Sequence, residues 1–305
     1  MRPSARPCVS VRENGLVTSP RGSETPPADS PLPARPRLIA TDLDGTLLHD
    51  DKSVSDRTVK ALAAAEEAGI EVFFVTGRPA RWMGVVSDHV HGHGMAICAN
   101  GAAVVDLHAG GKLIQDRPLD RATALDVVQA LRDAAPGTSC AIETTAGIHY
   151  EPAYPRFLDD PGATLDSAEK LLRESGEAAA ETSVLKLLAH HSELTPDGFL
   201  ALARTVAGDR ATITRSSPTA LLEISGLGVS KASTLALCCA ERGVSSDEVV
   251  AFGDMPNDLE MLTWAGTSYA MANAHPDVLA AASGRTVTNN EDGVAVVIEQ
   301  ILARL

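Results

Sequence analysis

Short, fully apolar runs separated by helix-length segments are the feature that most limits how this chain can fold. RLIA, IEVFFV and MAICA lie in the first hundred residues, and EVVAFG and TSYAMA follow in the last third. Strands that are apolar throughout, instead of at alternate positions, are typical of a parallel sheet with helices on both faces. We therefore expect an α/β fold built on a doubly wound parallel sheet.

The middle of the chain follows a different pattern. Segments such as CAIETTAGIHYEP and ATITRSSPTALLEI alternate apolar and polar residues, which is typical of strands with one exposed face. Helical stretches lie between them, and the mixture predicts a smaller α+β unit inserted into the doubly wound domain. We predict a core domain made of residues 37–103 and 220–305, and an inserted α/β cap domain made of residues 104–219.

Residues 1–36 differ in composition from the rest of the chain. This segment is rich in proline and arginine, has no apolar period and lacks the apolar stretch of a signal peptide. We predict a disordered tail and a cytoplasmic location.

No run in the sequence approaches about 18 apolar residues, so we expect no membrane-spanning helix. The formal net charge of −14 disfavours nucleic acid as a partner, because lysine and arginine clusters bind phosphate backbones.

Polar and small residues follow four of the predicted core strands at the point where each strand ends. Ligands of open parallel sheets bind beyond the carboxyl ends of the strands, where several loops converge. We therefore expect these residues to form one site. They are Asp42 and Asp44 after the first strand, Thr76, Gly77 and Arg78 after the second, Asn100 after the third, and Asp254, Asn257 and Asp258 after a strand in the last third.

The carboxylates in this set predict a metal ion. Four carboxylates in one crevice repel one another unless a cation lies among them, and oxygen ligands favour a hard ion such as Mg²⁺. Lys231, Arg78 and the hydroxyl of Thr76 are suited to the oxygens of a phosphoryl group. The combination indicates phosphoryl transfer.

Asp42 and Asp44 have distinct predicted roles. They are two residues apart in extended backbone, so their side chains are expected to point to the same side. Asp42, the first at the strand end, is our candidate nucleophile. Asp44 is our candidate acid and base, and we expect the like-charged neighbour to raise its pKa.

At these residues the sequence resembles the haloacid dehalogenase (HAD) superfamily, and within it the Cof-like phosphatases with an α/β cap of type IIB. The resemblance covers residues 37–305 and implies a Rossmann-like core with an inserted cap. The matching segments occur in the family's order: DLDGTLL (42–48), VTGR (75–78), CANGA (98–102), GVSKASTL (228–235) and GDMPNDLEML (253–262).

The resemblance also implies a role for each candidate residue. Asp42 would become the aspartyl-phosphate, and Asp44 would act as general acid and base. Arg78 and Asn100 are further candidates for substrate contacts, with a structural turn as the alternative. The implied Mg²⁺ ligands are Asp42, the backbone carbonyl of Asp44, Asp254 and, directly or through water, Asp258, and the implied phosphate-binding residues are Thr76, Gly77, Lys231 and Asn257.

These observations together predict a Mg²⁺-dependent phosphomonoester hydrolase whose partner is a small phosphorylated metabolite, a sugar phosphate or similar compound. Two alternatives remain open: a phosphosugar mutase of the same superfamily, and a regulator that binds a phosphorylated metabolite. The low aromatic content of 3% argues against a pocket that stacks nucleobases.

Overall fold

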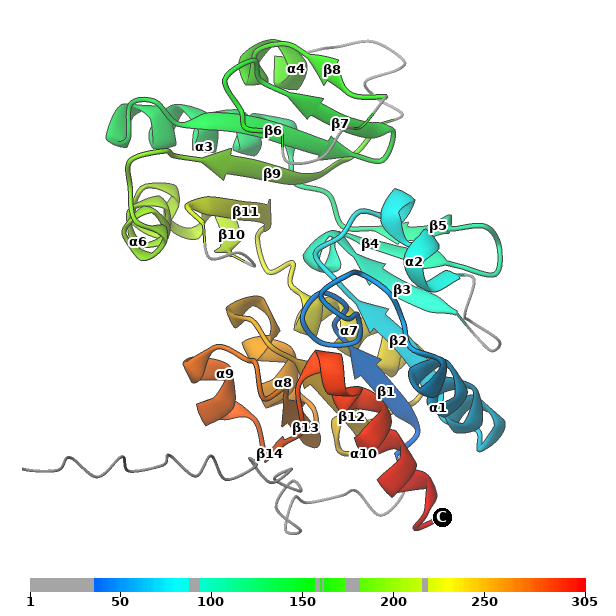
Figure 1. Cartoon of the computed structure of the whole chain (residues 1–305). Helices are drawn as coiled ribbons and strands as arrows, with labels where there is room; N and C mark the ends of the chain where they lie inside the picture. The colour runs from blue at the N-terminus through cyan, green and yellow to red at the C-terminus, as the bar shows by residue number, and fades with distance from the viewer. Residues whose placement is uncertain (1–35, 88–93, 157–159, 161, 174–181, 216–218) are drawn as a thin grey trace, which may run out of the picture.

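The computed structural model describes residues 36–305 except 88–93, 157–159, 161, 174–181 and 216–218. The predicted tail, residues 1–36, lies outside this part of the chain apart from Pro36. Two sheets organise the described residues, a larger one below and a smaller one above in Figure 1. None of the described helices is long and apolar enough to cross a membrane.

The larger sheet confirms the predicted parallel architecture. Its eight strands run in the order β14-β13-β12-β1-β2-β3-β4-β5, and the first six of these pair in parallel. The parallel strands are β1 (Leu38–Thr41), β2 (Glu71–Val75), β3 (Met95–Cys98), β12 (Val249–Gly253), β13 (Thr267–Ala270) and β14 (Gly284–Arg285). A hairpin of β4 (Ala103–Asp106) and β5 (Lys112–Asp116) adds two antiparallel strands at one edge.

Helices cover both faces of this sheet. The connections from β1 to β2 and from β12 to β13 leave the centre of the sheet in opposite directions, so right-handed crossovers place α1 and α8 on opposite faces. Helix α1 packs against α10, and α8 packs against α7 and α9 (Figure 1). Their bounds are α1 (Asp56–Glu67), α2 (Gly84–Ser87), α7 (Lys231–Glu241), α8 (Leu259–Trp264), α9 (Pro276–Ala281) and α10 (Gly293–Leu302), with the short 3₁₀ helices η1 (Ala80–Trp82), η2 (Ala99–Gly101), η4 (Ser246–Glu248), η5 (Pro256–Asp258) and η6 (Asn289–Glu291).

The smaller sheet belongs to the insertion, and helices pack on one of its faces. Its strand order is β10-β11-β9-β6-β7-β8, antiparallel except for the last pair. The strands are β6 (Ser139–Thr144), β7 (Gly147–Tyr150), β8 (Thr164–Leu165), β9 (Val184–His190), β10 (Ala211–Thr214) and β11 (Leu221–Gly226). The helices in the described part of this unit are α3 (Arg121–Ala134), α4 (Ala168–Arg173) and α6 (Pro196–Ala207), with the short 3₁₀ helix η3 (Gly208–Arg210). One apolar cluster joins these helices to the sheet.

The sheets put the junctions between the two units at different residues from the prediction. The predicted limits, 103/104 and 219/220, would assign β4 and β5 to the cap and β11 to the core. Instead β4 and β5 extend the larger sheet by hydrogen bonding to β3, while β11 pairs with β9 and β10 of the smaller sheet. We therefore propose junctions near residues 117–119 and 227–230.

The two connecting segments run side by side. A Cβ atom at Gly226 would lie only 2.8 Å from the backbone oxygen of Pro118, closer than a side chain tolerates. Leu119 donates its backbone N–H to Val184 of the cap, which fixes the outgoing segment. The chain therefore leaves the core and returns to it at one place.

Candidate active site

Asp42 and Asp254 lie at the carboxyl ends of two adjacent strands of the larger sheet, β1 and β12. The backbone N–H of Asp42 donates to the oxygen of Phe252 in β12, which fixes the first residue after β1. Gly45 then turns the chain with φ +80° and lies against Asp254, so close that a Cβ would be 2.3 Å from a carboxylate oxygen. The turn lets Thr46 Oγ1 donate to Asp254 Oδ1 over 2.9 Å.

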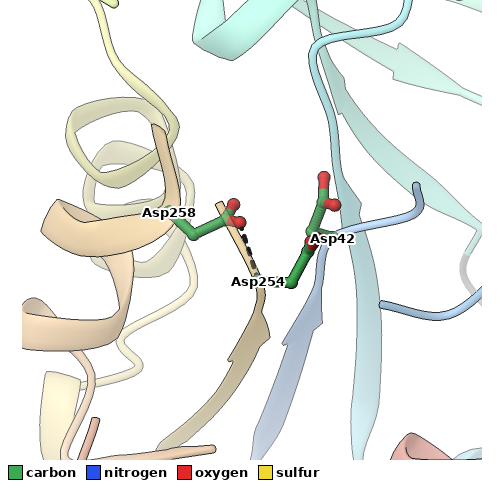
Figure 2. A group of neighbouring side chains, drawn as sticks. All are labelled: Asp42, Asp254 and Asp258. Carbon is green, nitrogen blue, oxygen red and sulfur yellow. Dashed lines mark hydrogen bonds between the residues drawn. The ribbon is translucent and has the colours of Figure 1, made fainter. Parts of the chain in front are cut away.

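Three buried carboxylates meet at this place. Oxygen atoms of Asp42, Asp254 and Asp258 all lie within 4.8 Å of one another. Figure 2 shows the side chains of Asp42 at the end of β1, Asp254 at the end of β12 and Asp258 on the following turn. The backbone N–H groups of Asp254 and Met255 donate to Asp258 Oδ2 at 3.0 and 2.9 Å, which holds that carboxylate toward the cluster.

Lys231 supplies a cation to this cluster. It is the first residue of α7, whose start is capped by Ser230, and its side chain is buried. Its Nζ lies 2.5 Å from Asp42 Oδ1 and 2.6 Å from Asp258 Oδ1. Burial disfavours its charge, but the two carboxylates more than offset burial and raise the pKa of Lys231 above its usual value. Lys231 is therefore a fixed ammonium group.

One ammonium group does not balance three carboxylates. Burial raises the pKa of Asp42 well above its usual value, and Asp258 and Asp254 raise it further, while Lys231 acts in the opposite direction. Burial and Asp258 likewise raise the pKa of Asp254 to about 7. An all-oxygen, buried donor set with excess negative charge fits a hard divalent cation such as Mg²⁺.

Asp44 does not belong to the group of three carboxylates, against expectation. Its side chain is 41% exposed, and Arg78 binds it in a bidentate pair, Nε to Oδ2 at 2.6 Å and Nη2 to Oδ1 at 2.7 Å. Lys52 Nζ adds a bond of 2.9 Å. Burial opposes the charge of Asp44, yet these cations lower its pKa to about 2. The prediction that crowding by Asp42 raises this pKa is wrong, because the carboxylate turns toward two cations instead.

The predicted phosphate-binding residues surround the same place. Thr76 is buried at the end of β2, and its Oγ1 accepts the N–H of Arg78 at 3.1 Å. Asn257 in η5 donates its Nδ2 to Asn100 Oδ1 at 3.2 Å, while its own Oδ1 is buried without a hydrogen-bond partner among the described residues. Asn100 adopts left-handed backbone angles (φ 55°, ψ 33°), which turn its side chain toward Glu223 of the cap.

A pocket of about 300 Å³ lies between the two units and opens onto these residues. Asp42, Asp44, Thr76, Gly77, Arg78 and Asn257 line its core side. Its other wall belongs to the cap, where Glu143, Lys186 and Glu223 are buried charged residues that sequence reasoning missed. Each is a single charged residue within a mainly apolar stretch, CAIET, VLKLLAH and LLEISG, and that pattern is the signal that could have indicated them.

The cap residues reach the core directly. Lys186 Nζ donates to the backbone oxygen of Gly77 at 2.8 Å and to Glu223 Oε2 at 2.8 Å. Glu223 also accepts from Asn100 Nδ2, and Arg81 in η1 of the core pairs with Glu143. The segment predicted to bind phosphate is therefore held against the cap.

Comparison with known proteins gives consistent relationships. Residues 39–298 match a family model of haloacid dehalogenase-like hydrolases. The chain is 30% identical over 262 residues to a 5-amino-6-(5-phospho-D-ribitylamino)uracil phosphatase of Bacillus subtilis, covering 86% of this chain and 94% of that one. It is 30% identical over 271 residues to a pyridoxal phosphate phosphatase of Escherichia coli, covering 85% and 96%.

The fold is also similar to solved structures. A HAD subclass IIB sugar phosphatase superposes with a TM-score of 0.71 at 21% sequence identity, covering 88% of this chain and 100% of that chain. At this identity the likeness concerns the fold, and it includes the inserted cap.

Proposed function

Because the chain belongs to the haloacid dehalogenase-like hydrolases, we propose that it is a phosphatase of the Cof-like, type IIB group. In this proposal it hydrolyses a small phosphomonoester with Mg²⁺ through an aspartyl-phosphate on Asp42. One observation carries this proposal. The buried ammonium of Lys231 bonds Asp42 and Asp258, and Asp254 lies within the same cluster. A protein that only binds a phosphorylated metabolite would also use such charges, but it would gain nothing from Asp44, the candidate acid and base.

In the proposed reaction an oxygen of Asp42 attacks phosphorus as the bond to the leaving oxygen breaks. Lys231 holds Asp42 and offers positive charge to the phosphoryl oxygens, together with Thr76 and the amide of Asn257. Water then attacks phosphorus, which breaks the bond to Asp42 and releases phosphate. Asp44 gives a proton to the leaving oxygen in the first step and takes one from water in the second.

Asp44 must change partners to do this. With a pKa of about 2 it is a carboxylate at neutral pH, so it cannot donate a proton while Arg78 and Lys52 are bound to it. A phosphoryl group in the pocket is an anion that competes with Asp44 for Arg78. We infer that substrate binding draws Arg78 away and raises the pKa of Asp44 at the moment when the proton is required.

The metal-binding residues would be Asp42, Asp254, Asp258 and the backbone oxygen of Asp44. When bound, Mg²⁺ supplies the positive charge that lets a carboxylate approach an anionic phosphate. The fit rests on the excess negative charge of the three buried carboxylates.

A phosphate-release assay tests the proposal. The chain, purified with and without Mg²⁺, is given a panel of phosphorylated metabolites and p-nitrophenyl phosphate. We expect Mg²⁺-dependent release that falls at least about 1,000-fold in Asp42→Asn, because the nucleophile is lost. Asp133→Asn, an exposed carboxylate on α3, is the matched control and should keep full activity.

The same assay separates the alternatives. Transfer of the phosphoryl group to a second hydroxyl of a hexose phosphate, without free phosphate, would identify a mutase. Tight binding without turnover across the panel would identify a regulator. Undiminished turnover by Asp42→Asn would show that the assigned nucleophile is wrong.

A further inference from the structure

The face of the cap sheet that turns toward the core has a composition of its own. Successive residues of a strand point to opposite faces. In β9, Leu187 and Ala189 pack into the apolar cluster beneath the helices, whereas Lys186 and Leu188 line the pocket. The pocket side therefore presents residues that lie outside the apolar cluster beneath the helices, and their chemistry bears on what the pocket can bind.

Aromatic side chains are concentrated in the pocket that this face lines. Two of the three tyrosines and one of the two tryptophans of the chain line the pocket: Tyr150, Tyr154 and Trp82. Tyr150 and Tyr154 stack with ring centroids 5.8 Å apart and planes 26° apart. Trp82 comes from η1 of the core, so aromatic groups stand on both the core side and the cap side of the same pocket.

Aliphatic side chains complete this wall. Ile148, Leu188 and Leu221 line the pocket and join Tyr150 and Tyr154 in a small apolar cluster. The hydroxyl groups of a polyol would have no hydrogen-bond partner against such a surface, which is unfavourable. A flat ring, by contrast, gains from contact with aromatic and aliphatic groups over both of its faces.

Hydrogen-bonding groups lie beside the apolar wall. Glu143 and Lys186 are direct neighbours across β6 and β9, and Glu223 faces Leu188 across β9 and β11. Glu223 is bound by Asn100 and Lys186, whereas Glu143 pairs with Arg81, and a carboxylate has acceptor positions beyond those used by one cation. An apolar wall with carboxylates at its margin suits a ring that carries N–H or O–H donors at its edge. The cavity volume of about 300 Å³ is at the lower end for ligand pockets, which suits one ring.

We propose that the leaving group of the substrate contains a single flat heteroaromatic ring, held against Tyr150 and Trp82, with its donor groups turned to Glu143. The inference rests on the proposed phosphatase function and adds the class of compound that the cap selects. The phosphoryl group then lies toward Asp42, at the core end of the same pocket.

Phosphate release from matched esters tests this inference. Pyridoxine 5′-phosphate and pyridoxamine 5′-phosphate carry such a ring and form no imine with lysine, whereas ribose 5-phosphate and glucose 6-phosphate carry none. We expect kcat/KM to be at least about tenfold higher for the ring esters, as expected when apolar contacts and donors are both satisfied. Free pyridoxine should inhibit competitively, and free ribose should not.

Variants of Tyr150 connect the preference to the pocket. Tyr150→Leu should lower kcat/KM for the ring esters about three- to tenfold more than for ribose 5-phosphate, because an aromatic contact is lost. Tyr150→Phe should restore the preference, since the ring remains. Thermal unfolding of both variants checks that the cap stays folded.

The outcomes also separate this inference from the function on which it rests. If Asp42-dependent phosphate release from the sugar phosphates equals or exceeds release from the ring esters, or if only p-nitrophenyl phosphate is hydrolysed, the ring inference is wrong and the phosphatase function stands. If no compound gives Asp42-dependent release, the proposed function fails and this inference fails with it.

Discussion

The buried ammonium group of Lys231 organises the three carboxylates of the candidate site. Lysine in the first turn of a helix opposes the helix dipole, so its position in α7 costs stability unless nearby anions offset it. Asp42 and Asp258 provide these anions at 2.5 and 2.6 Å. The same bonds that keep the lysine charged also hold the candidate nucleophile in place.

Replacing this lysine should affect activity and stability together. We expect Lys231→Met to lower kcat by about 100-fold or more, because charge stabilisation in the transition state is lost. The free energy of unfolding without metal should fall by about 3–5 kcal/mol, since two carboxylates remain buried without their cation. Denaturant titration and phosphate release measure both.

Lys60→Met is the matched control for this substitution. Lys60 is exposed on α1 and should tolerate methionine with little change in either measurement. A Lys231→Met protein with normal turnover would contradict the assigned charge role.

The sequence indicates which residues form the candidate site better than it indicates their contacts. The carboxylates and Lys231 follow from position, because each lies at a strand end or a helix start where loops converge. The partner of Asp44 was not predictable in this way. Arg78 is 34 positions away in the sequence, and the bidentate pair depends on how two loops fold toward each other.

The turn after β1 positions the carboxylates of the candidate site. It needs a residue with positive φ at Gly45, and it brings the chain against the carboxylate of Asp254. The turn therefore serves two purposes: it reverses the chain and it positions a metal-binding residue through Thr46.

Gly45→Ala, compared with a control substitution at Gly69, distinguishes the effect on Asp254 from the effect of backbone strain. An alanine there adopts an unfavourable φ, which costs about 1–3 kcal/mol, and its Cβ also displaces Asp254. We expect a large loss of Mg²⁺ affinity, measured by titration calorimetry, together with a loss of phosphate release.

Gly69→Ala is the matched control for this turn. Gly69 has nearly the same φ, +82°, but no atom lies within 4 Å of the position of its Cβ. It should lose comparable stability and keep its Mg²⁺ affinity. Equal Mg²⁺ affinity in both variants would contradict the role assigned to Gly45.

Among the elements, the parallel strands were the most predictable and the junction strands the least. A continuous apolar run identifies β1, β2, β3 and β12 because both faces of each are buried. The sequences of β4 and β11, AVVD and LLEISG, combine apolar residues with a carboxylate, and neither sequence indicates which of the two sheets the strand joins. The aromatic content of 3% did not indicate the aromatic side chains of the pocket. An average over the whole chain does not show where three aromatic rings lie close together.

For the molecule as a whole, the acidic cluster links stability to pH. The pKa of Asp254 in the folded chain, about 7, lies above its usual value of about 3.9 in an unfolded chain. The folded state therefore favours the protonated form. The stability that this group contributes is complete at low pH and is lost as pH rises from about 4 to about 7. Asp42 shifts in the same direction.

Mg²⁺ should remove this loss. We expect the Tm in EDTA to fall between pH 5 and pH 8, and Mg²⁺ at pH 8 to raise it by about 5 °C or more, because the ion binds only the folded chain. Thermal unfolding followed by circular dichroism at each pH measures the effect. Asp254→Asn should lessen both the fall and the rise, and a Tm in EDTA that climbs from pH 5 to pH 8 would contradict this account.

The paired connections near Pro118 and Gly226 have a consequence for how such a molecule can vary. The insertion leaves the core and returns to it at adjacent positions, so the core chain would run on almost unbroken if the insertion were cut out. The cap is in this sense a cassette. It can be exchanged for the cap of a relative without a change in the strand connectivity of the larger sheet. New substrates can then be acquired while the buried carboxylates and Lys231 stay unchanged.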